Sequence, residues 1–249
     1  DLLIAGDNGS TGFTLFGGEG TDTVKFTETN VAGADAFFTN ATSVEHVDFS
    51  DSTATLTLAA LAEAAGVISA TVSGTTGDID ASAYTSAVGL TLTAGSGAAS
   101  NLTGGDGADT LVGGALANAF ITNDGNDSIR IGGVVEGAVV HANQGNDTVE
   151  FASKIIGASK VRGGKGDDQI SSATALTSST VYGDLGKDTI VISGSVKAST
   201  IQGGNQVDTT TDGVDSIAVT GASTDLFVQT NAGADSLSLA ATTNVTARL

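Results

Sequence analysis

Large apolar side chains recur along the second half of the chain at intervals of about 20 residues. One column contains Leu102, Phe120, Val140, Val161, Val181, Ile201 and Val228. A second column contains Leu111, Ile129, Val149, Ile170, Ile190, Ile217 and Leu237, and an earlier pair, Leu15 and Val24, has the same spacing. Most flanking residues are polar, as is typical of strands with one buried face. Each repeat therefore predicts a strand, a turn, a second strand and a variable return segment, and such coils bury their apolar faces by stacking into a solenoid.

A segment rich in Gly and Asp lies between the two apolar columns. GGDGADTLV from Gly104 and GGKGDDQIS from Gly163 are complete examples. The aspartates at the sixth motif position are Asp22, Asp109, Asp127, Asp147, Asp168, Asp188, Asp215 and Asp235. From Asp109 onward they are 18, 20, 21, 20, 27 and 20 residues apart, and seven extra residues, Asn205 to Thr211, account for the interval of 27.

These segments resemble the RTX nonapeptide GGxGxDxUx, in which U is a large apolar residue. The resemblance covers Leu102 to about Ala240, with one further copy near Asp22. It implies an all-β, right-handed parallel β-roll or β-helix with several Ca²⁺ ions between stacked turns, ligated by sixth-position carboxylates and turn carbonyls. The return segments lack the motif, so we expect calcium-binding Gly/Asp turns along one edge only.

The expected metal-site residues follow from that motif. They are Asp22, Gly104, Asp106, Gly107, Asp109, Asp124, Gly125, Asp127, Gly145, Asp147, Gly163, Gly166, Asp168, Gly183, Gly186, Asp188, Asp212, Gly213, Asp215, Gly233 and Asp235. Turns stacked about 4.8 Å apart would bring successive carboxylates into repulsion. A hard dication with about 6–8 oxygen ligands bridges them instead. Supporting oxygens are expected from Asp106, Asp124 and Asp212 at the third motif position, whereas Lys165 and Leu185 at that position leave ligation to the backbone.

The first hundred residues follow the pattern less regularly. We predict two parts, a β-rich segment at 1–100 with irregular coils and a calcium-binding roll at 101–249. Strand-like pieces lie at 44–49, 54–58, 67–73 and 89–93, and 58–65, which ends at Gly66, is either a short helix or an irregular coil. SVEHVDFS from Ser43 and DIDASAY from Asp78 resemble segments that flank RTX turns in bacterial surface-layer (S-layer) proteins.

Composition and missing motifs reduce the number of function classes that the sequence supports. A net charge of -19 disfavours nucleic acid, and no apolar run reaches the roughly 18 residues of a membrane helix. The chain has no Cys, and its two histidines, His46 and His141, lie in strand-like segments where we expect them to face outward. No GxSxG, HExxH or Walker pattern occurs, so we do not expect an enzyme.

Three hypotheses remain for the whole protein. The first is a secreted structural protein of the bacterial cell surface, an S-layer or fibril building block that binds calcium and copies of itself. The second is the calcium-folding module of an RTX enzyme or toxin, and the third is a repeat segment of a giant adhesin that contacts another cell or a glycan. The sequence begins at Asp1 without a signal-peptide pattern, so we expect a piece of a longer protein.

Overall fold

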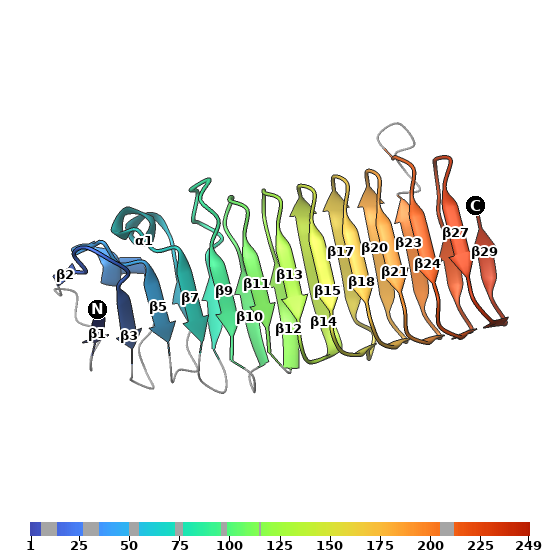
Figure 1. Ribbon diagram of the computed structural model, residues 1–249, viewed down its shortest axis with the longest axis horizontal. Coiled ribbons are helices and arrows are strands. Elements are labelled where there is room, and N and C mark those ends of the chain that lie inside the picture. The colour runs from blue at the N-terminus through green and yellow to red at the C-terminus, as the bar shows by residue number, and fades with distance from the viewer. Residues whose placement is uncertain are drawn as a thin grey trace.

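The protein is a parallel β-solenoid of about ten turns with about 20 residues per coil, as predicted (Figure 1). The computed structural model describes residues 1–5, 14–26, 35–49, 55–72, 77–95, 99–114, 116–204 and 212–249. The insertion at 205–211 and parts of the predicted strands at 54–58 and 67–73 lie outside these ranges. None of the described helices is long and apolar enough to cross a membrane.

In the described part of the chain the first sheet has 12 parallel strands, from β1 to β27. Its strands are, in order, β1 (Leu2–Ala5), β3 (Thr23–Phe26), β5 (His46–Phe49), β7 (Ser69–Val72), β9 (Thr91–Ala94), β11 (Thr110–Gly113), β13 (Ser128–Ile131), β15 (Thr148–Phe151), β18 (Gln169–Ser172), β21 (Thr189–Ile192), β24 (Ser216–Val219) and β27 (Ser236–Leu239). The sheet passes without interruption from β9 to β11, so it continues across residue 100.

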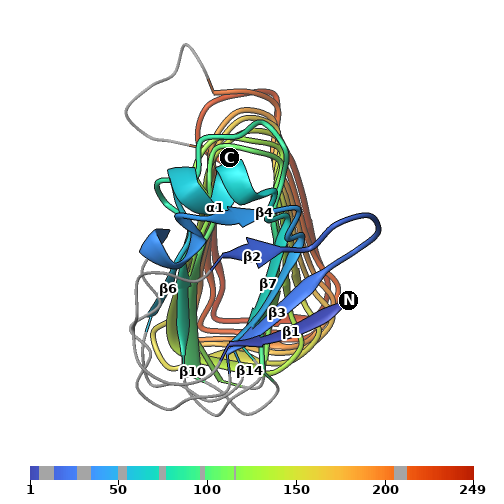
Figure 2. The same ribbon diagram turned by 90° about the vertical axis from the view of Figure 1, so that its left-hand side faces the viewer.

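The second sheet, with 15 strands among the described residues, lies opposite the first (Figure 2). It contains β6 (Thr55–Thr57), β8 (Asp78–Asp80), β10 (Ala99–Thr103), β12 (Leu116–Ile121), β14 (Val134–Gln144), β17 (Lys160–Lys165), β20 (Thr180–Leu185), β23 (Thr200–Gly204), β26 (Phe227–Gln229) and β29 (Thr246–Arg248). It also contains the short strands β16 (Ile155–Ile156), β19 (Leu176–Thr177), β22 (Val196–Lys197), β25 (Ser223–Thr224) and β28 (Thr242–Thr243). The return segments therefore form a short ladder of their own. The long strand β14 pairs with both β16 and β17.

The core lies between the sheets and includes the two predicted apolar columns. All their members are buried except Leu237, which is partly buried against the core. Strand pairing places like residues on one another, for example Val161 on Val181 and Ile170 on Ile190. Burying each such side chain contributes about 1.5–3 kcal/mol relative to leaving it exposed.

The first hundred residues contain the predicted strands and a short helix within the same stack. The predicted pieces correspond to β5, β6, β7 and β9, and α1 (Ala60–Ala65) ends at Gly66, whose φ of 97° is the left-handed conformation that Gly adopts readily. A 3₁₀ helix, η1 (Asp35–Phe38), precedes β4 (Ala41–Thr42), which pairs with β2 (Leu15–Phe16). The helix α1 joins β6 to β7, the step that a Gly/Asp turn makes in later coils.

Candidate calcium-binding edge

The Gly/Asp turns lie along one edge of the solenoid, where they join strands of the second sheet to strands of the first (Figure 1). The strands that follow these turns are paired in register, for example Thr148 with Gln169 and Gln169 with Thr189. The residue before each of these strand residues therefore falls in one column. From residue 109 onward, this column contains the sixth-position aspartates of the Gly/Asp turns. We call them the carboxylate ladder: Asp109, Asp127, Asp147, Asp168, Asp188, Asp215 and Asp235.

Hydrogen bonds connect the ladder from coil to coil. The backbone N–H of each aspartate donates to Oδ1 of the aspartate in the next coil, as Asp147 does to Asp168 and Asp168 to Asp188. The bonds are 2.7 to 2.9 Å long. The ladder members before Asp235 are at most 3% exposed. From Asp109 to Asp215 the ladder is thus a continuous row of buried carboxylates, one in each coil.

The second carboxylate oxygen lacks a hydrogen-bond partner in most of the ladder. The buried Oδ2 atoms of Asp127, Asp147, Asp168, Asp188 and Asp215 accept no hydrogen bond. In Asp109, by contrast, Oδ2 accepts from the N–H of Gly105 at 2.7 Å. A buried charge without a partner is costly, so these oxygens require a cation or a proton.

The pKa values reflect the same arrangement. Burial raises the pKa of Asp127 to about 6, of Asp147, Asp168 and Asp215 to about 7, and of Asp188 to about 8. Neighbouring carboxylates raise these pKa values further, while the N–H donated from the preceding coil lowers them. Without a metal, the ladder therefore holds protons near neutral pH, and a bound dication would displace them.

Glycine is required where the turns approach each other and where Oδ2 lies. A Cβ on Gly163, at the first motif position, would lie 2.3 Å from Oδ2 of Asp168. At the fourth position, Gly145 has a φ of 134°, and a Cβ there would lie 1.5 Å from the carbonyl oxygen of Gly125. The glycines thus let the turns stack closely and leave room beside the orphaned oxygens of Asp168, Asp188 and Asp215.

The third-position aspartates lie differently from the ladder. Asp106 and Asp124 are exposed, and Oδ1 of Asp124 accepts a hydrogen bond from Nε2 of Gln144. Asp212 is half-buried against Gly204, since a Cβ on that glycine would lie 1.8 Å from its Oδ2. Within the described residues no three His, Asp or Glu side chains gather closely enough to hold a metal. One ladder carboxylate per coil therefore needs backbone carbonyls to complete a calcium site.

Sequence reasoning missed a second ladder at the fifth motif position. The backbone N–H groups of Asn146, Asp167 and Lys187 donate to the side chains of Asn126, Asn146 and Asp167, respectively, at 2.8 to 2.9 Å. The sequence feature that could have predicted this second ladder is the recurrence of short amide and carboxylate side chains at the fifth position. These contacts join the turns without a metal.

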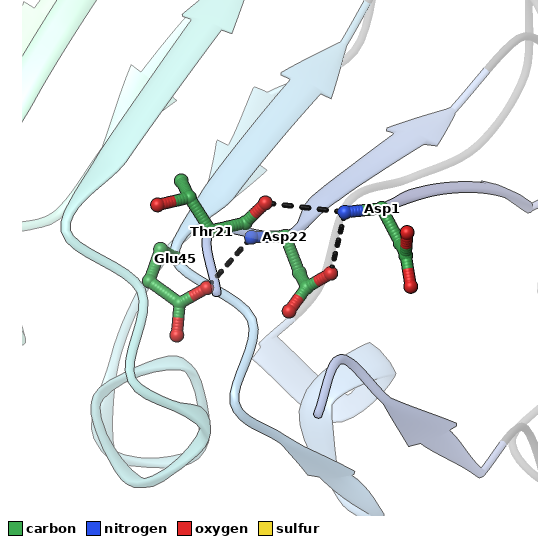
Figure 3. A network of polar contacts seen from close by, with 4 residues as sticks. All are labelled: Asp1, Thr21, Asp22 and Glu45. Carbon is green, nitrogen blue, oxygen red and sulfur yellow. Dashed lines mark hydrogen bonds and ion pairs between the residues drawn. The ribbon is translucent and has the colours of Figure 1, made fainter. Parts of the chain in front are cut away.

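The column continues toward the N-terminus with different residues. The register of Thr23, His46, Ser69 and Thr91 places Asp22, Glu45, Ile68 and Leu90 in it. The N–H of Asp22 donates to Oε2 of Glu45 at 2.8 Å, and Oδ1 of Asp22 pairs with the amino group of Asp1 at 2.7 Å (Figure 3). Ile68 and Leu90 carry no carboxylate, so the acidic column is interrupted for two coils.

Comparison with known proteins identifies the turns. A family model described as the RTX calcium-binding nonapeptide repeat (four copies) matches residues 91–118 and 103–133, which include Asp109 and Asp127. No curated protein and no solved structure matches the chain. RTX nonapeptide repeats bind Ca²⁺, the cation that a row of buried, unpaired carboxylate oxygens requires. The chain therefore carries RTX calcium-binding nonapeptide repeats, which are set in a parallel β-solenoid.

Proposed function

We propose that the protein is a calcium-dependent structural protein of the bacterial cell surface, a building block of an S-layer or a surface fibril. The observation that carries this proposal is the carboxylate ladder, whose buried Oδ2 atoms have no hydrogen-bond partner in five coils. A bound cation would pair these carboxylates in their charged form, which otherwise stay buried only when protonated. Calcium outside the cell would therefore switch folding on after export.

The metal would be held by the ladder carboxylates and by carbonyls of the glycine turns. Glycines at the fourth place of the motifs, and at the first place where it is Gly, would leave room for the metal. Asp22 would hold calcium in the N-terminal copy. Calcium supplies positive charge between successive carboxylates. The residues themselves position the oxygens, because each Oδ1 is fixed by an N–H of the preceding coil.

A structural role is favoured by the continuity of the solenoid. Two parallel sheets extend along its length, and the charged groups at its edge belong to the repeat. The acidic edge also offers calcium a second role in bridging neighbouring copies. We therefore infer that the parent protein self-associates when calcium is present.

Sedimentation of the parent protein over a calcium series tests this function, with electron microscopy of the calcium-loaded sample. Sheets or fibrils that appear with calcium and disperse with a chelator are expected. A folded monomer at millimolar calcium and high protein concentration would contradict the building-block role and favour an isolated module of an RTX enzyme or adhesin.

A further inference from the structure

A polar groove of about 540 Å³ lies on the outer side of the second sheet, close to the turns. Its lining comes from the ends of β14, β17 and β20 and from the turn after β12. His141 and Arg162 stand side by side on paired strands, and both are flanked by residues of the buried core. The groove therefore lies outside the core and apart from the buried carboxylate ladder.

One side of the groove offers hydrogen-bond acceptors. Nδ2 of Asn123 donates to the carbonyl oxygen of Gly104 at 3.0 Å, and Nδ2 of Asn143 donates to that of Thr122. Nε2 of Gln144 likewise donates to Asp124. Neighbouring coils engage one N–H of each amide nitrogen, so the amide oxygens are acceptors that the three side chains offer to a ligand, together with the second N–H of each nitrogen.

The other side offers hydrogen-bond donors held in fixed positions. The guanidinium of Arg162 stacks on the ring of Tyr182 at 4.3 Å, and its Nη1 donates to both carboxylate oxygens of Asp184 at 2.8 and 3.1 Å. A guanidinium has five N–H donors, so this anchoring leaves donors for a ligand. Burial and the charge of Arg162 lower the pKa of His141, whose neutral ring carries one donor and one acceptor.

We propose that this groove binds a neutral oligosaccharide. A sugar hydroxyl donates and accepts hydrogen bonds at the same time, so it satisfies both sides of the groove. An anion would face the carboxylates of Asp124 and Asp184, and an apolar ligand would leave the polar lining unpaired. Different side chains from successive coils, about 4.8 Å apart, line the groove, and this spacing suits an extended chain of sugars.

Sugar binding and calcium are linked through the turns, a step that rests on the proposed function. Asn123, Asn143 and Gln144 occupy the second and third positions of motifs whose sixth residues are Asp127 and Asp147. Calcium that orders these turns would also position the acceptor side of the groove. Removal of calcium is therefore expected to abolish sugar binding together with the fold of the turns.

Isothermal titration calorimetry of the full chain in millimolar calcium tests the proposal. The probes are cellotetraose, maltotetraose and mannotetraose, with tetragalacturonate as the charged counterpart. At least one neutral tetrasaccharide is expected to bind, and Arg162→Ala should weaken its binding about tenfold or more. Arg130→Ala is the matched control, since Arg130 lies 3.8 Å from its partner Glu150 on the first sheet, outside the groove. The Arg130→Ala variant should bind the tetrasaccharide with the same affinity as the unmodified protein.

Three results would overturn the groove proposal: no neutral probe binds at millimolar concentration, tetragalacturonate binds best, or the two Arg variants behave alike. Circular dichroism of the same samples shows whether the protein is folded, so that failure of the sugar-site proposal can be distinguished from failure of the calcium-dependent folding proposal. A protein that folds and binds sugar in chelator would contradict the folding proposal and retain the sugar site. A protein that folds with calcium and binds no neutral probe would contradict the sugar site alone.

Discussion

The solenoid closes the same edge in two different ways. From Asp109 to Asp235 the edge consists of Gly/Asp turns over a row of buried carboxylates. In the described residues between 35 and 95 it includes α1 and η1, and the ladder column contains the exposed Ile68 and the buried Leu90. One region needs a cation for its buried charge, whereas the other satisfies its polar groups with its own hydrogen bonds.

The metal-independent edge is held by identifiable contacts. The carboxylate of Asp35 accepts the N–H groups of Ala59, Leu61 and Ala62 at 2.9 Å, which caps the start of α1. Buried Tyr84 donates its hydroxyl to the carbonyl oxygen of Val67. Stability in this region should therefore respond little to calcium, and the following predictions test that contrast.

Removal of calcium should have the largest effect. Each site filled at a hundredfold excess over its Kd contributes about 2.7 kcal/mol, and several sites along the ladder add together. In chelator at pH 8, strand content by circular dichroism and the unfolding midpoint should both fall. An unchanged spectrum and midpoint in chelator would show that the buried carboxylates tolerate their charge without metal.

The calcium-free protein should also depend on pH in an unusual direction. Burial raises the pKa of Asp168 to about 7 and of Asp188 to about 8, above about 3.9 for Asp in an unfolded chain. Between these values the folded state binds more protons than the unfolded state. The contribution of these two carboxyl groups to the free energy of unfolding is therefore fully present below about pH 4 and is lost as pH rises through 7 to 8. Urea unfolding in calcium-free buffer should give its highest midpoint at the acid end, and a midpoint that rises toward pH 8 would contradict this.

The effect of replacing one ladder carboxylate on stability should have opposite signs with and without calcium. In calcium, Asp168→Asn should destabilise the protein by about 3 kcal/mol, because it removes one partner of a buried charge pair. Without calcium at pH 8 it should stabilise, because it removes a buried charge that lacks a partner. Asp225→Asn is the control, since this residue is outside the motif, and its effect should stay within about 0.5 kcal/mol. Equal responses of the two variants in urea titrations would reject the ladder register.

The smallest predicted effect concerns the metal-independent edge. Asp35→Ala removes the acceptor for three N–H groups at the start of α1 and should cost about 1–2 kcal/mol. The loss should be the same in calcium and in chelator whenever the protein is folded. A loss seen only in calcium would show that this edge is coupled to metal binding.

The sequence was most informative where the repeat is regular. The apolar columns predicted the parallel stack, because like residues such as Val161 and Val181 recur one coil apart and pair directly. The sixth-position aspartates were predicted to share one edge, and Asp147, Asp168 and Asp188 do. For 58–65 the sequence left a short helix and an irregular coil as alternatives, and the structure has the helix, which ends at the left-handed Gly66.

Other features could not be predicted from the sequence, because they depend on which residues the fold brings together. Glu45, Ile68 and Leu90 share the column of the ladder without sharing its motif, so only strand register reveals them. The short strand β16 has two residues, too few to show alternation. The polar groove combines side chains from coils about 20 residues apart, such as Arg162 and Asp184, which no local motif links.

Hydrogen–deuterium exchange at pH 8, compared with and without calcium, tests the central contrast most directly. We predict that calcium removal sharply increases exchange in β13, β15, β18 and β21, the strands that follow ladder aspartates. Exchange in α1, β5 and β7 should change much less, because their edge is closed by hydrogen bonds and packing. Equal loss of protection in both regions, or no loss in either, would contradict the account of one solenoid with a calcium-dependent and a metal-independent edge.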